Sequence, residues 1–285
     1  MSNKVIKIIG VGGGGVNVVN NMLSAGISGV DFVLYDKEEH SGKIREFFDD
    51  GTRLTFVIVG MGGDVGTYAA PVIASIAKDL GIITVAIATM PFRNEGEMRY
   101  GKAMEGVNEL KNNVDALLVI DIEKMAADNV LLKDVFTKAN KDITICVKDI
   151  VEVITTRDRY VSLDFADVKS FFKDGGITVL GTATANGPNR AVEAVQKAFS
   201  SPMMYKNDIS SARRIFLNIT AKNDENGLKL CELTDIMDFV NNAAKNASIR
   251  WGAGYDDLLE DAVRVTVFAT DFLDDSIEKQ NALLT

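Results

Sequence analysis

Four consecutive glycines, Gly12–Gly15, directly follow an apolar stretch near the start of the printed sequence. Together with Gly10 they satisfy the spacing GxGxxG between a predicted strand and a predicted helix. Glycine permits positive φ and lets a phosphate approach the main chain, and a helix that starts there offers unpaired N–H groups. The segment therefore indicates an anion site. A purely structural strand-to-helix turn stays open as the alternative, because this spacing alone is a weak signal.

A second glycine-rich loop, GMGGDVGT over residues 60–67, also follows an apolar stretch and opens a helical pattern. Two neighbouring glycine-rich helix starts form a larger anion cradle than a single dinucleotide turn needs, which favours a nucleoside polyphosphate. Asp36 stands 21 residues after Gly15, where a Rossmann fold places the acid that binds ribose. A dinucleotide-dependent oxidoreductase therefore stays open as a second hypothesis.

The elements that must position these loops form an alternating pattern. Apolar, β-branched runs predict strands over 4–12, 30–36, 54–60, 82–89 and 115–122. The intervening segments predict helices over 16–26, 70–81 and 96–112, with a short helix inside 41–51 and with Pro71 in a first turn. Strands that are apolar throughout and alternate with helices predict a parallel sheet covered on both faces.

The second half has a different pattern. A long helix is predicted from about Leu132, followed by an acidic loop that enters a helix over 162–172. Strands are expected over 177–184, 212–220, 249–257 and 264–272, and helices over 188–200 and 232–247. We predict a nucleotide-binding domain at 1–130, a central helical connection at 131–158, an α+β domain at 159–272 and a frayed tail at 273–285.

Composition limits the classes of function. The 285 residues are 47% hydrophobic, which is enough for a substantial core, and the formal charge of −9 disfavours nucleic acid as a partner. His40 is the only histidine and Cys146 and Cys231 are the only cysteines, so we predict no metal centre in the protein and no Ser–His–Asp mechanism. No apolar run is as long as a membrane span, and two cysteines suit a reducing compartment. We therefore expect a cytoplasmic protein that does not insert into membranes.

Taken in order, these segments resemble the FtsZ/tubulin superfamily, and its bacterial cell-division family FtsZ most closely. The first glycine loop is similar to the family's phosphate loop, and the second to its tubulin motif. PFRNEGEMR (91–99), VFTKAN (135–140) and SLDFADV (162–168) are similar to the ribose, base and synergy-loop segments. The resemblance covers nearly the whole chain. It implies a Rossmann-like parallel-sheet GTPase domain of α/β class, a long central helix and a smaller α+β C-terminal domain.

The resemblance also implies site residues. Glu95 and Arg99 would meet the ribose, and Phe136 and Asn140 the guanine, while Asp164 and Asp167 would orient a water in the site of a neighbouring subunit. The complete nucleotide-binding set comprises two glycine loops and four other residues: Gly12, Gly13, Gly14, Gly15, Asn17, Gly62, Gly63, Gly66, Thr67, Glu95, Arg99, Phe136 and Asn140. An N-terminal helix cap is the alternative role of the two aspartates.

The resemblance further implies GTP or GDP as the ligand. Magnesium is an additional candidate, because a carboxylate such as that of Asp64 and phosphate oxygens are its usual ligands. It implies head-to-tail assembly, because a heterologous contact that does not close makes a filament. The expected partners are further copies of the chain, with other FtsZ-type subunits as candidates.

Several residues depart from the family pattern. Asp64 and Val65 replace the Gly–Thr pair of the tubulin motif, Tyr68 replaces a glycine, and the segment between Asp36 and Phe56 is shortened. A bare carboxylate about 4 Å from a phosphate costs on the order of 4 kcal/mol at an effective dielectric constant near 20. Three hypotheses follow: a divergent GTPase, a pseudo-GTPase that polymerises or regulates filaments with weak or no nucleotide binding, and, more remotely, the oxidoreductase.

Overall fold

The structure is a computed structural model that describes residues 5–36, 44–125, 131–156, 159–204 and 209–272. His40 and the predicted tail at 273–285 lie outside the described residues. The chain divides into two compact units: Met1–Val151 with Phe172–Thr178, and Glu152–Phe171 with Val179–Thr285. The domain boundaries near residues 130 and 159 stay predictions.

The first unit is built on a six-stranded sheet in which every pairing is parallel and the strand order is β2-β1-β3-β4-β5-β6. This confirms the predicted parallel sheet. The strands are β1 Ile6–Val11, β2 Asp31–Tyr35, β3 Leu54–Gly60, β4 Ile83–Met90, β5 Ala116–Asp121 and β6 Gly176–Ile177. All residues of β1 and β4 are buried, as a sheet covered on both faces requires.

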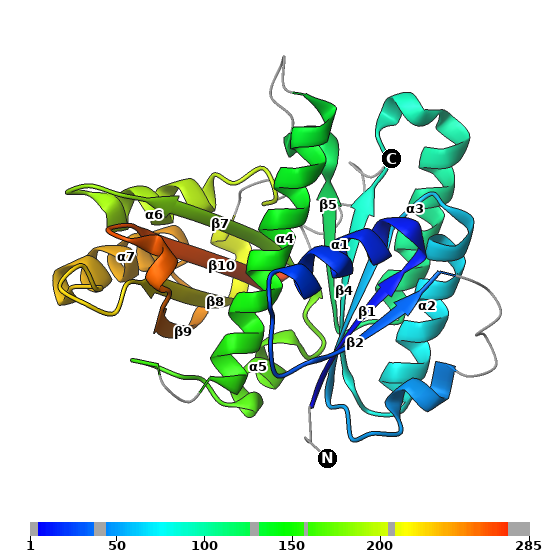
Figure 1. Cartoon of the computed structure of the whole chain (residues 1–285), viewed down its shortest axis with the longest axis horizontal. Coiled ribbons are helices and arrows are strands. Elements are labelled where there is room, and N and C mark those ends of the chain that lie inside the picture. The colour runs from blue at the N-terminus through cyan, green and yellow to red at the C-terminus, as the bar shows by residue number, and fades with distance from the viewer. Residues whose placement is uncertain (1–4, 37–43, 126–130, 157–158, 205–208, 273–285) are drawn as a thin grey trace. The chain divides into compact units, whose positions relative to one another are not determined.

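Helices cover both faces of this sheet (Figure 1). They are α1 Gly12–Ser24, α2 Asp64–Asp79, α3 Glu97–Asn112 and α4 Leu132–Thr155, with short 3-10 segments at Arg93–Glu95 and Ile122–Met125. On the face of α2 and α3, the buried side chains include Ile9, Val57 and Val59. Strand residues alternate between faces, so the neighbouring positions of β1 and β3 point toward α1 on the other face.

Two helix starts differ from the prediction by four and six residues, and the other predicted helix starts agree to within three. α1 begins at Gly12 instead of residue 16, and α2 begins at Asp64 instead of residue 70. Pro71 is therefore the eighth residue of α2 and not part of its first turn, which corrects that expectation. The reason is that Gly63 takes an extended N-cap conformation, with φ −88° and ψ 156°, so the helix forms from the loop residues onward. The glycine loops themselves are thereby the first turns of the two helices.

The second unit contains a four-stranded mixed sheet in the order β7-β10-β8-β9, with β10 antiparallel to β7 and β8, and β8 parallel to β9. Its strands are β7 Val179–Ala185, β8 Ala212–Ala221, β9 Ser248–Tyr255 and β10 Val263–Phe272. Its helices are α6 Arg190–Phe199 and α7 Leu230–Ala243, and α5 Phe165–Phe172 follows the acidic loop. Apolar side chains of α6 and α7 share one buried cluster with the sheet.

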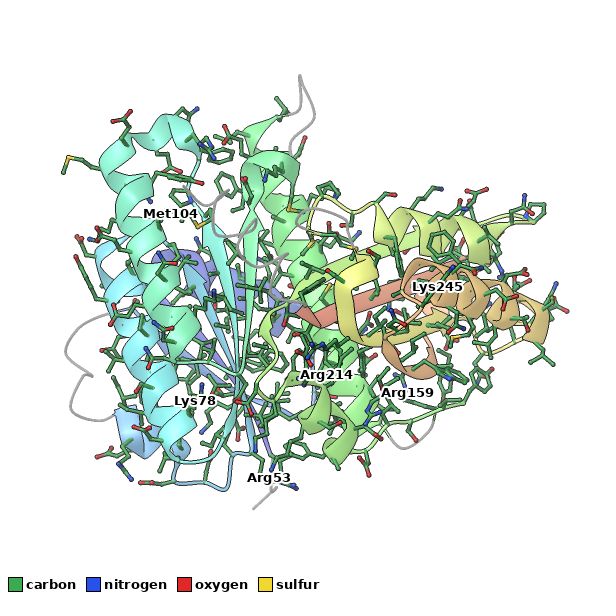
Figure 2. The ribbon with its side chains drawn as sticks, turned by 180° about the vertical axis from the view of Figure 1, so that it is seen from behind. Arg53, Lys78, Met104, Arg159, Arg214 and Lys245 are labelled. Atoms are coloured by element: carbon green, nitrogen blue, oxygen red, sulfur yellow. The ribbon has the colours of Figure 1, made fainter. Side chains whose placement is uncertain are left out.

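Buried and half-buried arginines tie the second unit together. Arg214 (Figure 2) makes a 2.8 Å ion pair with Asp271 of β10 and donates to the carbonyl oxygens of Ser170 and Phe171 at 2.9 and 3.0 Å. Val161 forms an antiparallel bridge with Ala253 of β9. These contacts fix the residue before the acidic loop and the last turn of α5 to the sheet of their own unit.

The single strand predicted over 177–184 is wrong. Gly176–Ile177 pairs with β5 as the sixth strand of the first sheet, and Thr178 donates its N–H to the carbonyl oxygen of Leu117 at 2.9 Å. Val179–Ala185 is β7 of the other sheet. A continuous apolar run has no internal signal for such a division, because either sheet edge offers unpaired backbone groups. Within the described ranges, no helix is long and apolar enough to cross a membrane.

Candidate functional site

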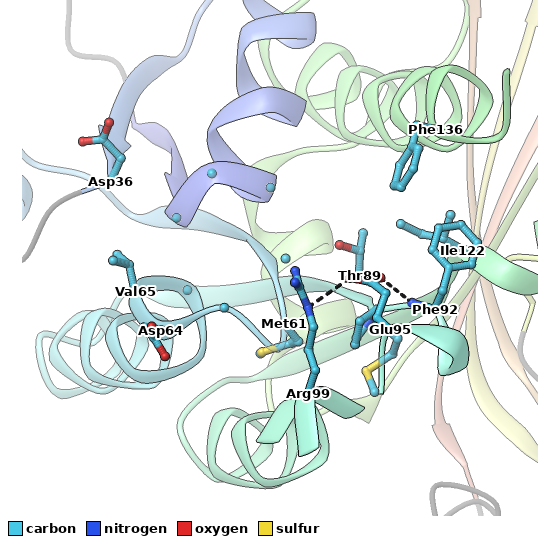
Figure 3. Close-up of a pocket in the computed structure, with 18 residues that line it drawn as sticks. Asp36, Met61, Asp64, Val65, Thr89, Phe92, Glu95, Arg99, Ile122 and Phe136 are labelled. Atoms are coloured by element: carbon cyan, nitrogen blue, oxygen red, sulfur yellow. Dashed lines mark hydrogen bonds and ion pairs between the residues drawn. The ribbon is translucent and has the colours of Figure 1, made fainter. Parts of the chain in front are cut away.

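A cavity of about 470 Å³ lies at the carboxyl ends of the central strands of the first unit (Figure 3). Ligands of parallel α/β sheets bind at this edge. The lining consists of the two glycine loops, the end of β4 with the segment after it, and single residues from four other places in the unit: Gly12, Gly13, Gly14, Asp36, Gly60, Met61, Gly63, Asp64, Val65, Gly66, Thr89, Met90, Pro91, Phe92, Glu95, Arg99, Ile122 and Phe136.

The two glycine loops pack backbone against backbone. A Cβ at Gly12, whose φ is +67°, would lie 2.9 Å from the backbone nitrogen of Gly66. A Cβ at Gly14 would lie 3.1 Å from the Cα of Gly60. Any side chain at Gly12 would therefore push the loops apart. The close approach joins the two predicted anion sites into one cradle.

The helices that start in this cradle have no side-chain cap. Val11 is the N-cap of α1 and Gly63 is the N-cap of α2, and neither makes a side-chain capping bond. The first N–H groups of a helix have no partner within the helix, and its N-terminus carries a partial positive charge. Two such ends at one cavity suit an anion with several phosphate groups.

An aromatic pair lies at another part of the cavity. The rings of Phe136, on α4, and Phe92, just after β4, meet edge to face with centroids 5.5 Å apart and an interplanar angle of 85°. Phe136 is 40% exposed, so its ring is accessible to a planar ligand. Phe92 was missed from the sequence as a site residue. Its position immediately beyond a central parallel strand is the signal that could have identified it.

Glu95 and Arg99 line the cavity and bind each other. Arg99 Nε lies 3.1 Å from a carboxylate oxygen of Glu95, and the other oxygen accepts the N–H of Phe92 at 2.8 Å (Figure 3). The predicted ribose-binding pair therefore stands at the cavity in a defined arrangement that also holds the aromatic residue.

Three predicted glycine-loop residues lie behind the lining. A Cβ at Gly15 would lie 2.1 Å from the carbonyl oxygen of Ile58, so glycine there permits α1 to pack on β3. Gly62 has a φ of +88°, and its N–H donates to the hydroxyl of buried Thr67 at 2.9 Å. These residues shape the loops and are absent from the surface of the cavity.

Two predicted asparagines are also outside the lining. Asn17 is exposed on α1, and its carbonyl oxygen accepts from Asn21. Asn140 lies on α4 four residues after Phe136, so the two share a helix face, and its carbonyl oxygen accepts from Thr144 at 2.7 Å. The structure thus brings Phe136 to the cavity and leaves Asn140 one helical turn away.

Asp64 is paired instead of bare. The ammonium of Lys102, on α3, donates to its carboxylate and lies 4.7 Å from the ring centroid of Tyr68. The hydrogen bond and the charge of Lys102 lower the pKa of Asp64 below its ordinary value, and the same hydrogen bond raises the pKa of Lys102. A neutralised pair repels a phosphate much less than the lone carboxylate that the sequence suggested.

The aspartates of the acidic loop cap their own helix. Asp164 accepts the N–H of Asp167 at 2.8 Å, and Asp167 accepts the N–H of Asp164 at 3.3 Å, in the reciprocal pattern of a capping box. Arg250 Nε lies 3.4 Å from a carboxylate oxygen of Asp167 and 3.3 Å from the Ser170 hydroxyl. The cap role is therefore present, and the catalytic role of both residues stays a prediction.

A parallel sheet whose cavity joins two glycine-loop helix starts, followed in sequence by an α+β unit with a mixed sheet, defines a nucleotide-binding protein of the tubulin class. A family model described as the GTPase domain of the Tubulin/FtsZ family matches residues 35–129, and one described as the FtsZ family C-terminal domain matches residues 176–273.

Relatives and solved structures agree with these matches. The chain is 36% identical to the cell division protein FtsZ of Porphyromonas gingivalis, covering 94% of this chain and 67% of the relative. For the FtsZ of Neisseria meningitidis the identity is 34%, with 95% and 79% covered. An empty FtsZ dimer from M. jannaschii superposes with a TM-score of 0.84 at 32% identity, covering 93% of this chain and 88% of that one. The chain belongs to the FtsZ family.

A more distant structure shows the same fold. It is a CetZ2 protofilament from Haloferax volcanii with bound GTPγS, at 17% identity and a TM-score of 0.77, covering 98% of both chains. The first relative aligns over 308 positions, more than this whole chain contains, so it carries residues without a counterpart here. That difference is consistent with the shortened segment predicted after Asp36.

Proposed function

We propose that the cavity of the first unit binds a guanine nucleotide and that copies of the chain assemble head to tail, in cell division or a related cytoskeletal role in the cytoplasm. The observation that carries the proposal is the meeting of two uncapped glycine-loop helix starts, at α1 and α2, in one cavity. The edge-to-face pair of Phe92 and Phe136 offers a stacking surface for the base.

In this proposal the acidic loop of one copy completes the site of the next. The side chains of Asp164 and Asp167 stand at an exposed helix start, where each accepts a backbone N–H and keeps further oxygen lone pairs free. A carboxylate can orient a water and accept its proton as the water attacks the γ-phosphate. Arg250 beside Asp167 offsets part of the negative charge that the loop would carry toward a polyphosphate.

Magnesium would have to be held mainly by the nucleotide. Over the described stretches, no three acidic, histidine or cysteine side chains are grouped to hold a metal ion. Magnesium sites in nucleotide-binding proteins commonly use phosphate oxygens, waters and one or two carboxylates. Asp64, in the first turn of α2, is the carboxylate nearest in sequence to the glycine loops. A magnesium ion bound there would neutralise part of the charge of the phosphates.

A second candidate function is a pseudo-GTPase that assembles or regulates filaments without efficient hydrolysis. Two observations favour it: Asp64, Val65 and Tyr68 depart from the residues of the tubulin motif, and Arg250 engages the predicted catalytic carboxylate of Asp167. The GTPase-domain match over 35–129 leaves no support for the dinucleotide oxidoreductase.

The decisive measurement is phosphate release from GTP at increasing protein concentration. Because the site needs two copies, we expect the rate per protein molecule to rise steeply above a threshold at which pelletable polymer forms. A rate per molecule that is constant across concentrations would contradict completion in trans. Polymer without phosphate release would favour the pseudo-GTPase. Binding of GTP and GDP, but not NAD, in calorimetry would confirm the ligand class.

A further inference from the structure

The second unit has an apolar cavity of about 250 Å³ beside the acidic loop. Its walls are Tyr160, Val161, Leu228, Leu230, Leu233 and Trp251. Leu230 is 80% exposed and Tyr160 is 54% exposed. Such an open group of large apolar side chains is unusual on a protein that stays alone in water and marks an interaction surface.

The first unit carries an apolar side chain of matching character. Met98 is 92% exposed in the first turn of α3, between Glu97 and Arg99. Glu95 and Arg99 line the nucleotide cavity, so Met98 directly precedes a lining residue, although it is not itself part of the lining. Methionine is flexible and polarizable and fills irregular apolar gaps well.

The two features are connected through the proposed function, on which this inference rests. Val161, in the wall of the apolar cavity, directly precedes the acidic loop. If that loop closes the nucleotide cavity of a neighbouring copy, the apolar cavity lies beside the border of that nucleotide cavity, close to Met98 of the neighbouring copy. Exposed Glu97 adjoins Met98 and carries the charge opposite to that of exposed Lys229 in the apolar cavity, while Arg99, on the other side of Met98, is paired with Glu95.

We propose that Met98 of one copy inserts into the cavity formed by Tyr160, Leu230, Leu233 and Trp251 of the next copy. The occupant is thus a second copy of this chain. The knob belongs to one unit and the cavity to the other, so the contact is heterologous. Each copy offers Met98 on one unit and the apolar cavity on the other, and a heterologous contact that does not close generates an open filament.

Disulfide trapping tests the contact. Cys231 is exposed and Cys146 is buried, so Cys231→Ser gives a background without an accessible thiol among the described residues. In that background, protein with Met98→Cys is mixed with protein with Leu230→Cys and oxidised under assembly conditions with GTP. We expect a cross-linked dimer, because a disulfide forms only when the Cβ atoms approach within about 4 Å. Leu258→Cys, at an 88% exposed leucine in the second unit, is the matched control.

A polar substitution of Met98 measures how much the contact contributes to assembly. Met98→Ser should raise the threshold concentration for assembly about tenfold, since burying one large apolar side chain has roughly that effect. The affinity of the single subunit for GTP should not change, and Met98→Leu should restore assembly.

The outcomes separate the two proposals. Wild-type protein that neither pellets nor shows concentration-dependent phosphate release would overturn the proposed function together with this inference. Wild-type protein that assembles normally would overturn this inference alone in two cases: if Met98→Ser assembles equally well, or if Leu258→Cys cross-links to Leu230→Cys better than Met98→Cys does.

Discussion

The helix starts of α1 and α2 differ from the start of α5 in what satisfies their first N–H groups. At α1 and α2 the N-cap residues, Val11 and Gly63, make no side-chain capping bond, and both helix starts face a cavity. At α5 the carboxylates of Asp164 and Asp167 accept backbone N–H groups reciprocally. The partial positive charge of a helix N-terminus is thus used in two ways. At α1 and α2 the glycine loops leave room for a bound anion, whereas at α5 the carboxylates of the protein itself occupy that position.

The largest effect is expected when a carboxylate is introduced into the first turn of α1, which would make it resemble the start of α5. In Gly13→Asp we expect nucleotide affinity to fall roughly a thousandfold, since a like charge near phosphate costs about 4 kcal/mol. Apart from its chain neighbours and the backbone of its own helix, no atom of the described residues lies within 4 Å of a Cβ at Gly13, so the side chain fits. Calorimetry with GTP measures the loss, and Gly13→Asn is the neutral control. Equal affinity of the two variants would contradict the anion cradle.

Removing one charge at α5 should separate capping from catalysis. The side-chain oxygen of asparagine can still accept the N–H of Asp164, so Asp167→Asn should leave the melting temperature and GTP affinity nearly unchanged. Phosphate release from polymer should fall about a hundredfold, the usual effect of losing a positioned base. If hydrolysis stays at the wild-type rate, Asp167 serves only as the cap that the structure shows.

The base end of the cavity gives a smaller effect. Phe136→Leu should weaken guanine nucleotide binding about tenfold, because stacking of a base on an aromatic ring contributes about 1–3 kcal/mol. Stability should change little, since the ring is 40% exposed. Phe136→Tyr, which keeps a ring against Phe92, is the control in a fluorescence titration. Wild-type affinity in Phe136→Leu would remove this residue from the site.

The smallest effect is expected where α2 resembles α5 by carrying an acid in its first turn. Asp64→Gly with Val65→Thr should improve GTP affinity only about threefold, because Lys102 already neutralises Asp64 and exposed pairs contribute little. In a Lys102→Met background the same double change should improve affinity more. An equal gain in both backgrounds would show that Lys102 does not shield the phosphates.

Local pattern was sufficient for most of the fold. The buried runs that became β1, β3, β4 and β5 were recognisable because a strand covered on both faces is apolar at most positions, with few exceptions such as Lys7 of β1. The helix starts were not recognisable, because the loop glycines are poor helix formers whose conformation is imposed by packing. The division of the run at Thr178 was not recognisable either, because its first part pairs with β5 of one sheet and its second part with β10 of the other, and nothing within the run marks the change.

In the site, only residues that belong to a short sequence motif could be recognised from the sequence. Gly12, Glu95 and Phe136 were predicted and line the cavity. Phe92 and Lys102 were missed, because their partners, Phe136 and Asp64, stand 44 and 38 residues away along the chain.

By itself the sequence determined the parallel α/β class, the two glycine loops and the order of motifs that places the chain in the FtsZ family. These properties depend on residue types at short spacing, where backbone sterics and burial act directly. Only the tertiary structure decided that the loops touch at Gly12 and Gly66, that Asp64 has a cationic partner and that Asp167 lies beside Arg250. Those contacts join segments distant in sequence, so they arise only when the packed sheets bring them together.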